Sequence, residues 1–125
     1  MKFTEGYWLL SERTNGQFAS QAYHIEAMEN GLRVVAPTSP VLSRGDTLNR
    51  PTITIEFLAV SPEVISVRAW HYEGYRTGEA RFEKKETTCD AVVTITENEA
   101  VLDAGRVSVH VDRKNWGYSF WACLL

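Results

Sequence analysis

Residues 23–36 read YHIEAMENGLRVVA, a pattern typical of a β-hairpin. Two apolar-rich runs, residues 23–29 and 32–36, flank the dipeptide Asn30-Gly31. A tight two-residue hairpin turn needs positive φ angles, which Asn and Gly adopt more readily than other residues. The stretch therefore predicts two antiparallel strands joined by a turn at Asn30-Gly31.

A second hairpin is predicted after residues 37–51, a loop rich in Pro, Ser and Gly. Residues 52–57 alternate polar and apolar side chains, which is typical of a strand with one buried face. The chain turns at residues 61–63 and returns through residues 64–72. The alternation predicts a core-facing set made of Ile53, Ile55, Phe57, Ile65, Val67 and Ala69.

The rest of the chain predicts more strands and almost no helix. Residues 75–90 are polar and indicate a long loop or an irregular edge strand, and only residues 11–22 show weak helical spacing. Strand-like runs follow at residues 91–96, 100–102 and 106–111, and again from Trp116. About nine short strands separated by turns predict an all-β fold, an antiparallel β-sandwich. A closed barrel fits the sequence less well. Closure leaves no edge strand, whereas the last strand is expected to form an apolar edge.

Composition indicates one ordinary globular domain at most. The chain has 125 residues, 44% of them hydrophobic, and a formal net charge of −3, so it is not basic enough to suggest nucleic acid as a partner. The first residues lack the apolar run of a signal peptide, and no apolar run is long enough to span a membrane. We expect a cytoplasmic protein without membrane contact, with Cys89 and Cys123 as reduced thiols.

The histidines predict no metal site. His24, His71 and His110 fall on separate predicted strands, without the spacing of metal ligands. Proton transfer at a sugar would require His71 or His110 to flank the ring together with Glu56 or Glu73. We interpret the histidines as structural or surface residues instead.

The acidic residues predict no catalytic pair either, because turn chemistry explains their positions. They fall at turns or strand ends, namely at Asp46, Asp90, Asp103 and Asp112. Phosphate-binding loops and nucleophile elbows are also missing from the sequence. We therefore expect no catalytic residue, metal ligand or cofactor in this chain.

Four aromatic residues are the candidates for contact with a sugar or with another domain: Trp70, Tyr72, Tyr75 and Trp116. Trp70 and Tyr72 alternate with the core-facing positions, so we expect them on the opposite face of the second hairpin, and Tyr75 follows shortly after. Such a platform can stack on sugar rings or pack on another domain, and packing is the commoner use.

Residues 65–74 read ISVRAWHYEG, which fits the pattern Val-x-Val-x-x-x-His-x-x-Gly with Ile at the first position. Other matching segments occur in order at residues 6–10, 30–31, 48–57, 92–97, 100–103, 105–111 and 116–125. In this order the segments resemble the N-terminal region of glycoside hydrolase family 31 enzymes, especially the α-xylosidase branch. The resemblance spans the whole chain.

The resemblance implies a galactose-mutarotase-like β-sandwich that precedes a (β/α)₈ barrel. Enzymes of this family hydrolyse α-glycosidic bonds with retention, using two barrel aspartates as nucleophile and acid/base. The barrel alone needs roughly 200 residues or more, so it lies outside residues 1–125 and no catalytic residue is carried over. His71 and Gly74 match the family pattern, and the resemblance implies a structural role for both residues. Because the family's sandwich is longer than this chain, we expect residues 1–125 to be its first part.

The apolar residues 115–125 are expected to form an edge strand that needs a partner. The expected partners are the rest of a parent chain with its catalytic barrel, α-xyloside or α-glucoside sugars, and a second copy bound through this strand. The alternative function is a stand-alone carbohydrate-binding module that uses the surface aromatics. A third possibility is a small mutarotase-like enzyme.

Overall fold

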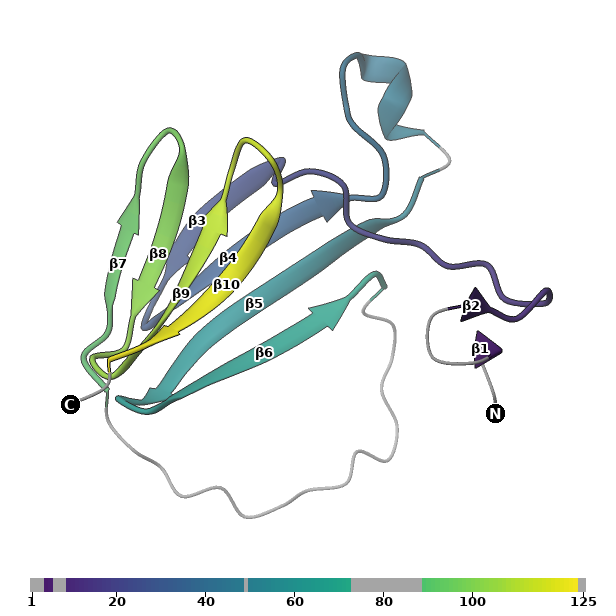
Figure 1. The fold of residues 1–125 in the computed structure, drawn as a ribbon. Coiled ribbons are helices and arrows are strands. Elements are labelled where there is room, and N and C mark those ends of the chain that lie inside the picture. Colours follow the sequence, from purple (N-terminus) through teal and green to yellow (C-terminus); the bar gives the residue numbers. More distant parts are fainter. Residues whose placement is uncertain (1–3, 6–8, 49, 73–88, 124–125) are drawn as a thin grey trace.

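The computed structural model describes residues 4–5, 9–48, 50–72 and 89–123. Two four-stranded antiparallel sheets form its framework (Figure 1). The first sheet has the order β3-β4-β5-β6, with bounds β3 His24–Met28, β4 Gly31–Pro37, β5 Thr52–Ser61 and β6 Val64–Trp70. The second has the order β10-β9-β8-β7, with bounds β7 Val92–Ile95, β8 Glu99–Asp103, β9 Val107–Asp112 and β10 Gly117–Ala122.

Three short elements lie outside these sheets. The strands β1 (Thr4–Glu5) and β2 (Leu9–Leu10) pair with each other, and the 3₁₀ turn η1 (Arg44–Thr47) lies in the predicted loop between β4 and β5. The weak helical spacing of residues 11–22 does not lead to a helix in the structure. The predicted all-β antiparallel sandwich is therefore confirmed.

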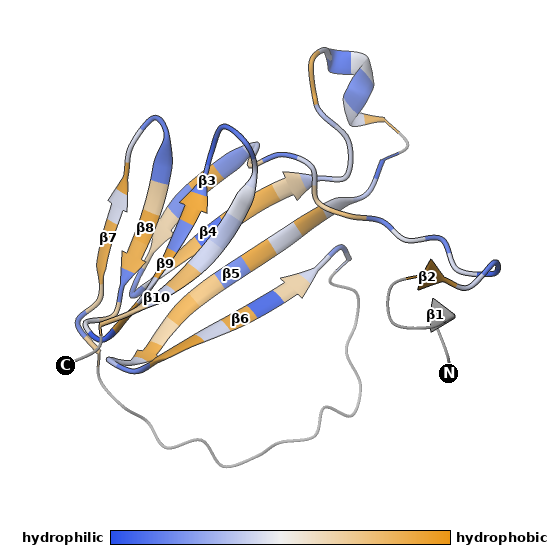
Figure 2. Ribbon diagram, viewed as in Figure 1, coloured by the Kyte–Doolittle hydropathy of each residue, from blue (hydrophilic) through white to orange (hydrophobic). Residues whose placement is uncertain are grey.

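The core lies between the two sheets and draws on both. Alternation along each strand turns every second side chain inward, and Figure 2 shows alternating hydrophobic bands along β5. The buried cluster consists of Leu32, Val34, Ala36, Ile55 and Phe57 from the first sheet, and of Ala100, Leu102, Val109 and Val111 from the second. Ile53 and Ile65 pack against this cluster. The predicted inward positions of the β5 residues are thus confirmed.

The first hairpin forms as predicted, but its turn lies one residue earlier. Met28 pairs with Gly31, so Glu29 and Asn30 make the turn, and Asn30 carries the positive φ of 54°. Gly31 already belongs to β4, where an added Cβ would lie 2.6 Å from Leu58 Cδ2 and 2.7 Å from the Phe57 carbonyl oxygen. The glycine is therefore required by the close approach of β5.

Among the described residues, the sandwich is open along one side, which we call the open margin and define by Val67, Ala69, Tyr118 and Phe120. Val67 lies opposite Phe57 and thus has the predicted inward orientation, yet it is 43% exposed. On β10, Tyr118 and Phe120 are 46% and 49% exposed, although both rings contact Phe57. In Figure 1, β6 extends beyond the second sheet, so the described strands of that sheet do not cover the whole inward face of β6.

The remaining predictions differ from the structure in small ways. β6 ends at Trp70, so His71 and Tyr72 follow the strand instead of belonging to it. β8 spans Glu99–Asp103 and is thus one residue longer at each end than the predicted run 100–102. Residues 73–88, and with them most of the predicted polar loop, lie outside the described residues.

Candidate functional site

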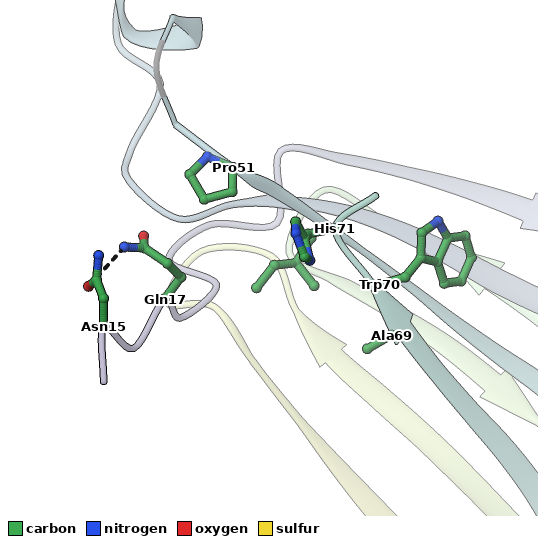
Figure 3. A pocket seen from close by; sticks show the side chains of 7 residues that line it. Asn15, Gln17, Pro51, Ala69, Trp70 and His71 are labelled. Carbon is green, nitrogen blue, oxygen red and sulfur yellow. Dashed lines mark hydrogen bonds between the residues drawn. The ribbon is translucent and has the colours of Figure 1, made fainter. Parts of the chain in front are cut away.

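An open cleft of about 550 Å³ lies where β5 begins and β6 ends. It is lined by Asn15, Gln17, Pro51, Ile53, Ala69, Trp70 and His71. The side chain of Gln17 donates a hydrogen bond to Asn15 at 3.3 Å, and in Figure 3 the Trp70 ring points away from both of them. The cleft thus presents amide and imidazole groups beside apolar side chains, with Trp70 at its border.

Trp70 has the predicted outward orientation. Its ring lies under the Arg68 guanidinium, whose carbon is 5.1 Å from the ring centroid, and both side chains project from the face of β6 opposite the core. Tyr72 follows the strand and is 80% exposed. These two aromatic residues are accessible at the end of the first sheet.

Trp116 lies on the other sheet, in the turn between β9 and β10. It has a positive φ of 48°, packs partly buried against the core, and contacts the Tyr118 ring at a centroid distance of 6.3 Å. Tyr75 lies outside the described residues. The structure thus places Trp116 apart from Trp70 and Tyr72, and the predicted contact with a sugar or another domain stays a prediction for all four aromatics.

Glu56, a predicted proton-transfer candidate, is instead part of an ion-pair row on the outer face of the first sheet. Its Oε1 accepts hydrogen bonds from the Arg33 guanidinium at 2.7 and 2.9 Å, and Arg33 also donates to Glu26 at 2.8 Å. The hydrogen bonds to Glu56, and then to Glu26, raise the pKa of Arg33 above its ordinary value. Glu56 is only 7% exposed. Its hydrogen-bonded partner is Arg33 and not a histidine, so its role is to neutralise the guanidinium.

Three of the predicted turn aspartates accept hydrogen bonds from backbone N–H groups in their own turns. Asp46 accepts hydrogen bonds from the backbone N–H groups of Leu42 and Ser43, which lower its pKa. The backbone N–H groups of Asn115 and Lys114 lower the pKa of Asp112 in the same way. Asp103 accepts from the backbone N–H of Gly105, at 2.8 Å. These bonds confirm the interpretation of the three residues as turn residues.

The part of the chain that the structure describes holds no group of three or more side chains placed to bind a metal ion. Within the same residues, none of the helical segments has the length and apolar character needed to cross a membrane. Cys89 is buried and Cys123 exposed, and both are free thiols. The cytoplasmic location stays a prediction.

Sequence reasoning missed a side-chain group on the outer face of the second sheet. His110 Nδ1 lies 2.7 Å from Glu99 Oε1, and His110 Nε2 lies 3.1 Å from Ser108 Oγ. The Trp121 ring lies beside the imidazole, at a centroid distance of 5.6 Å. Ser108 and His110 are two residues apart on β9 and therefore share a face, whereas Glu99 and Trp121 come from the two neighbouring strands.

A comparison with known proteins connects the chain to a glycoside hydrolase. No protein-family model matches the sequence. The chain is 35% identical over 113 residues to alpha-xylosidase XylQ from Lactiplantibacillus pentosus. The match covers 87% of this chain but only 14% of that protein, so the chain spans a small part of the curated relative it matches. This similarity supports the glycoside hydrolase relationship that the sequence resemblance indicated.

Proposed function

We propose that residues 1–125 form the first part of a non-catalytic N-terminal β-sandwich domain in a retaining α-glycosidase of the α-xylosidase type. The observation that carries the proposal is the 35% identity to an α-xylosidase that is several times longer than the matched region. In this proposal the catalytic aspartates lie on a (β/α)₈ barrel beyond these residues. The substrates of the parent enzyme would be α-xylosides or α-glucosides.

The carboxylates of the described residues support a non-catalytic role. Retaining glycosidases need two carboxyl groups about 5 to 5.5 Å apart, on either side of the scissile bond. Here Glu56 is held by Arg33, Glu63 by Arg106 and Glu99 by His110. Asp46, Asp103 and Asp112 accept backbone hydrogen bonds in their own turns. These contacts give each of these six carboxylates a structural partner.

The open margin supports a role in packing. Its apolar side chains are exposed although they face inward, and within the described residues β6 and β10 are the outermost strands on this side. An apolar margin next to two sheet edges is a surface that complete domains usually cover. We therefore propose that the following part of the parent chain adds strands here, and that the completed sandwich packs on the barrel and helps to shape the substrate entrance.

The reading frame of the source gene beyond the codon of Leu125 tests this proposal. We expect the frame to continue for several hundred codons, first through further strand-like segments and then through alternating strand and helix patterns with the catalytic aspartates. A stop codon directly after Leu125 would leave no barrel, and the proposed parent enzyme would then be wrong for this product.

The isolated 125-residue chain is expected to self-associate through the open margin, because a bare apolar edge strand pairs with a second copy. Phe120→Lys places a charge on the inward face of β10 and should restore a monomer. The matched control is Tyr23→Lys, an aromatic residue that is 57% exposed next to β3, at the opposite edge of the first sheet. Static light scattering at tens of micromolar distinguishes the species. A clean monomer of the unmodified chain would contradict this prediction.

A further inference from the structure

The outer face of the second sheet carries an aromatic side chain beside a fixed row of polar groups. Trp121 on β10, His110 on β9 and Glu99 on β8 form a diagonal across three neighbouring strands. Since neighbouring strands lie about 4.8 Å apart, these three strands span a width of about 10 Å. We propose that this face binds a neutral pyranose sugar, with Trp121 as the stacking platform. The face is argued from residues of this chain alone, and only the choice of the probe sugar rests on the proposed function.

Trp121 is held in an orientation that suits stacking. Its Nε1–H donates a hydrogen bond to Ser119 Oγ at 3.0 Å, and the His110 ring lies beside it at an angle of 50°. These two contacts fix the indole, yet 63% of Trp121 remains exposed. A large aromatic ring that is fixed by its neighbours and open to solvent offers an apolar surface at low entropic cost. The apolar C–H face of a pyranose ring matches such a surface.

The polar groups next to Trp121 are also fixed in place. The Glu99 carboxylate can only accept, so His110 Nδ1–H donates to it, and Nε2 of His110 lies within hydrogen-bond distance of the Ser108 hydroxyl. The side chains of His110 and Glu99 are 29% and 48% exposed, so both can be reached by a ligand. Sugar hydroxyls can donate to the Glu99 carboxylate while the ring stacks on Trp121.

A hollow of about 250 Å³ continues the polar end of this face, where β8 begins and β9 ends. It is lined by Asn98, Glu99, Asp112, Lys114 and Asn115. The hollow combines amides, carboxylates and one ammonium group. It therefore offers both donors and acceptors, and its charged groups include both signs. Hydroxyl groups, which both donate and accept, suit this mixture better than an anion or a cation.

The same residues do not favour hydrolysis at Ser108. The order Ser108, His110, Glu99 matches that of a nucleophile, a base and an orienting carboxylate. Acyl transfer also needs N–H donors for the oxyanion, next to the nucleophile. β9 is paired with β8 on one side and β10 on the other, so its backbone N–H groups are used in the two ladders. The geometry therefore points to binding.

The test is an NMR titration of the 125-residue chain, observed through the indole Nε1–H signals of its tryptophans and through the backbone amide signals of β8, β9 and β10, which also report binding by Trp121→Ala. The probe is an α-xylose-bearing xyloglucan oligosaccharide, and sorbitol serves as an open-chain polyol with hydroxyls but no ring. We expect the oligosaccharide to shift the Trp121 signal in a saturable way, and sorbitol to leave it unchanged. Trp121→Ala should raise the Kd at least about tenfold, a loss of about 1.4 kcal/mol.

Two further variants separate this site from the cleft and from loss of folding. Glu99→Gln keeps the shape of the side chain and should weaken binding severalfold, whereas Phe18→Ala, at an aromatic side chain that is 70% exposed and outside this face, should leave the Kd unchanged. The Trp70 and Trp116 signals of the Trp121→Ala variant report whether it is folded. The proposal is overturned if no signal saturates, if only the Trp70 signal moves, or if binding survives Trp121→Ala.

Discussion

Replacement of Phe57 by alanine is expected to lower the free energy of unfolding by about 3 to 5 kcal/mol. Phe57 is fully buried on β5, and its ring meets the Tyr118 ring at 5.1 Å and the Phe120 ring at 6.4 Å. Since Tyr118 and Phe120 belong to the second sheet, the variant removes a contact that joins both sheets. Domains are stable by only about 5 to 15 kcal/mol, so the loss is a large share of the total.

Urea unfolding followed by circular dichroism measures this difference. Phe18→Ala is the matched control, because it makes the same chemical change at a side chain that is 70% exposed. We expect the control to stay within about 0.5 kcal/mol of the unmodified chain. A Phe57→Ala variant as stable as the Phe18→Ala variant would show that the two sheets do not share the core described above.

Gly31→Ala is expected to destabilise the chain by about 1 to 3 kcal/mol, the usual cost of overpacking. The added methyl group would lie 2.7 Å from the Phe57 carbonyl oxygen, which is a backbone atom of the neighbouring strand and cannot move by rotation of a side chain. The strands β4 and β5 would have to separate at this point. Thermal or urea unfolding of the variant gives the change in stability.

Gly117→Ala provides the comparison for Gly31→Ala, because a Cβ at Gly117 on β10 meets no heavy atom within 4 Å. An alanine there would clash with no neighbouring atom, and it would reduce the conformational freedom of the unfolded chain. We therefore expect the free energy of unfolding to stay the same or to rise slightly. Equal stabilities of the two variants would contradict the close approach of β4 and β5.

Local patterns predicted the strands well because alternation at period two depends on only a few neighbouring residues. The turn of the first hairpin shows the limit of this reasoning. Asn30-Gly31 fits a local turn rule, but the structure uses Gly31 for its contact with β5, about 27 residues further along the chain. The face of Val67 was predicted correctly, whereas its exposure depends on how far the opposite sheet reaches.

The candidate sites depend on register even more strongly. The spacing of Ser108 and His110 on one strand places them on one face from sequence alone. Glu99 and Trp121 join them only through the pairing of β9 with β8 and β10, which no local pattern specifies. Trp116 looked like a surface aromatic, but it lies in a turn with positive φ and packs against the core.

Hydrolysis of an aryl α-xyloside by the complete gene product, compared with the 125-residue chain, tests whether residues 1–125 are a non-catalytic part of an α-glycosidase. We predict that the complete product releases the aryl group and forms the sugar product with retained anomeric configuration, and that the 125-residue chain shows no hydrolysis above the spontaneous rate. A complete product that is inactive on α-glycosides, or a 125-residue chain that catalyses the reaction by itself, would contradict the proposed non-catalytic role.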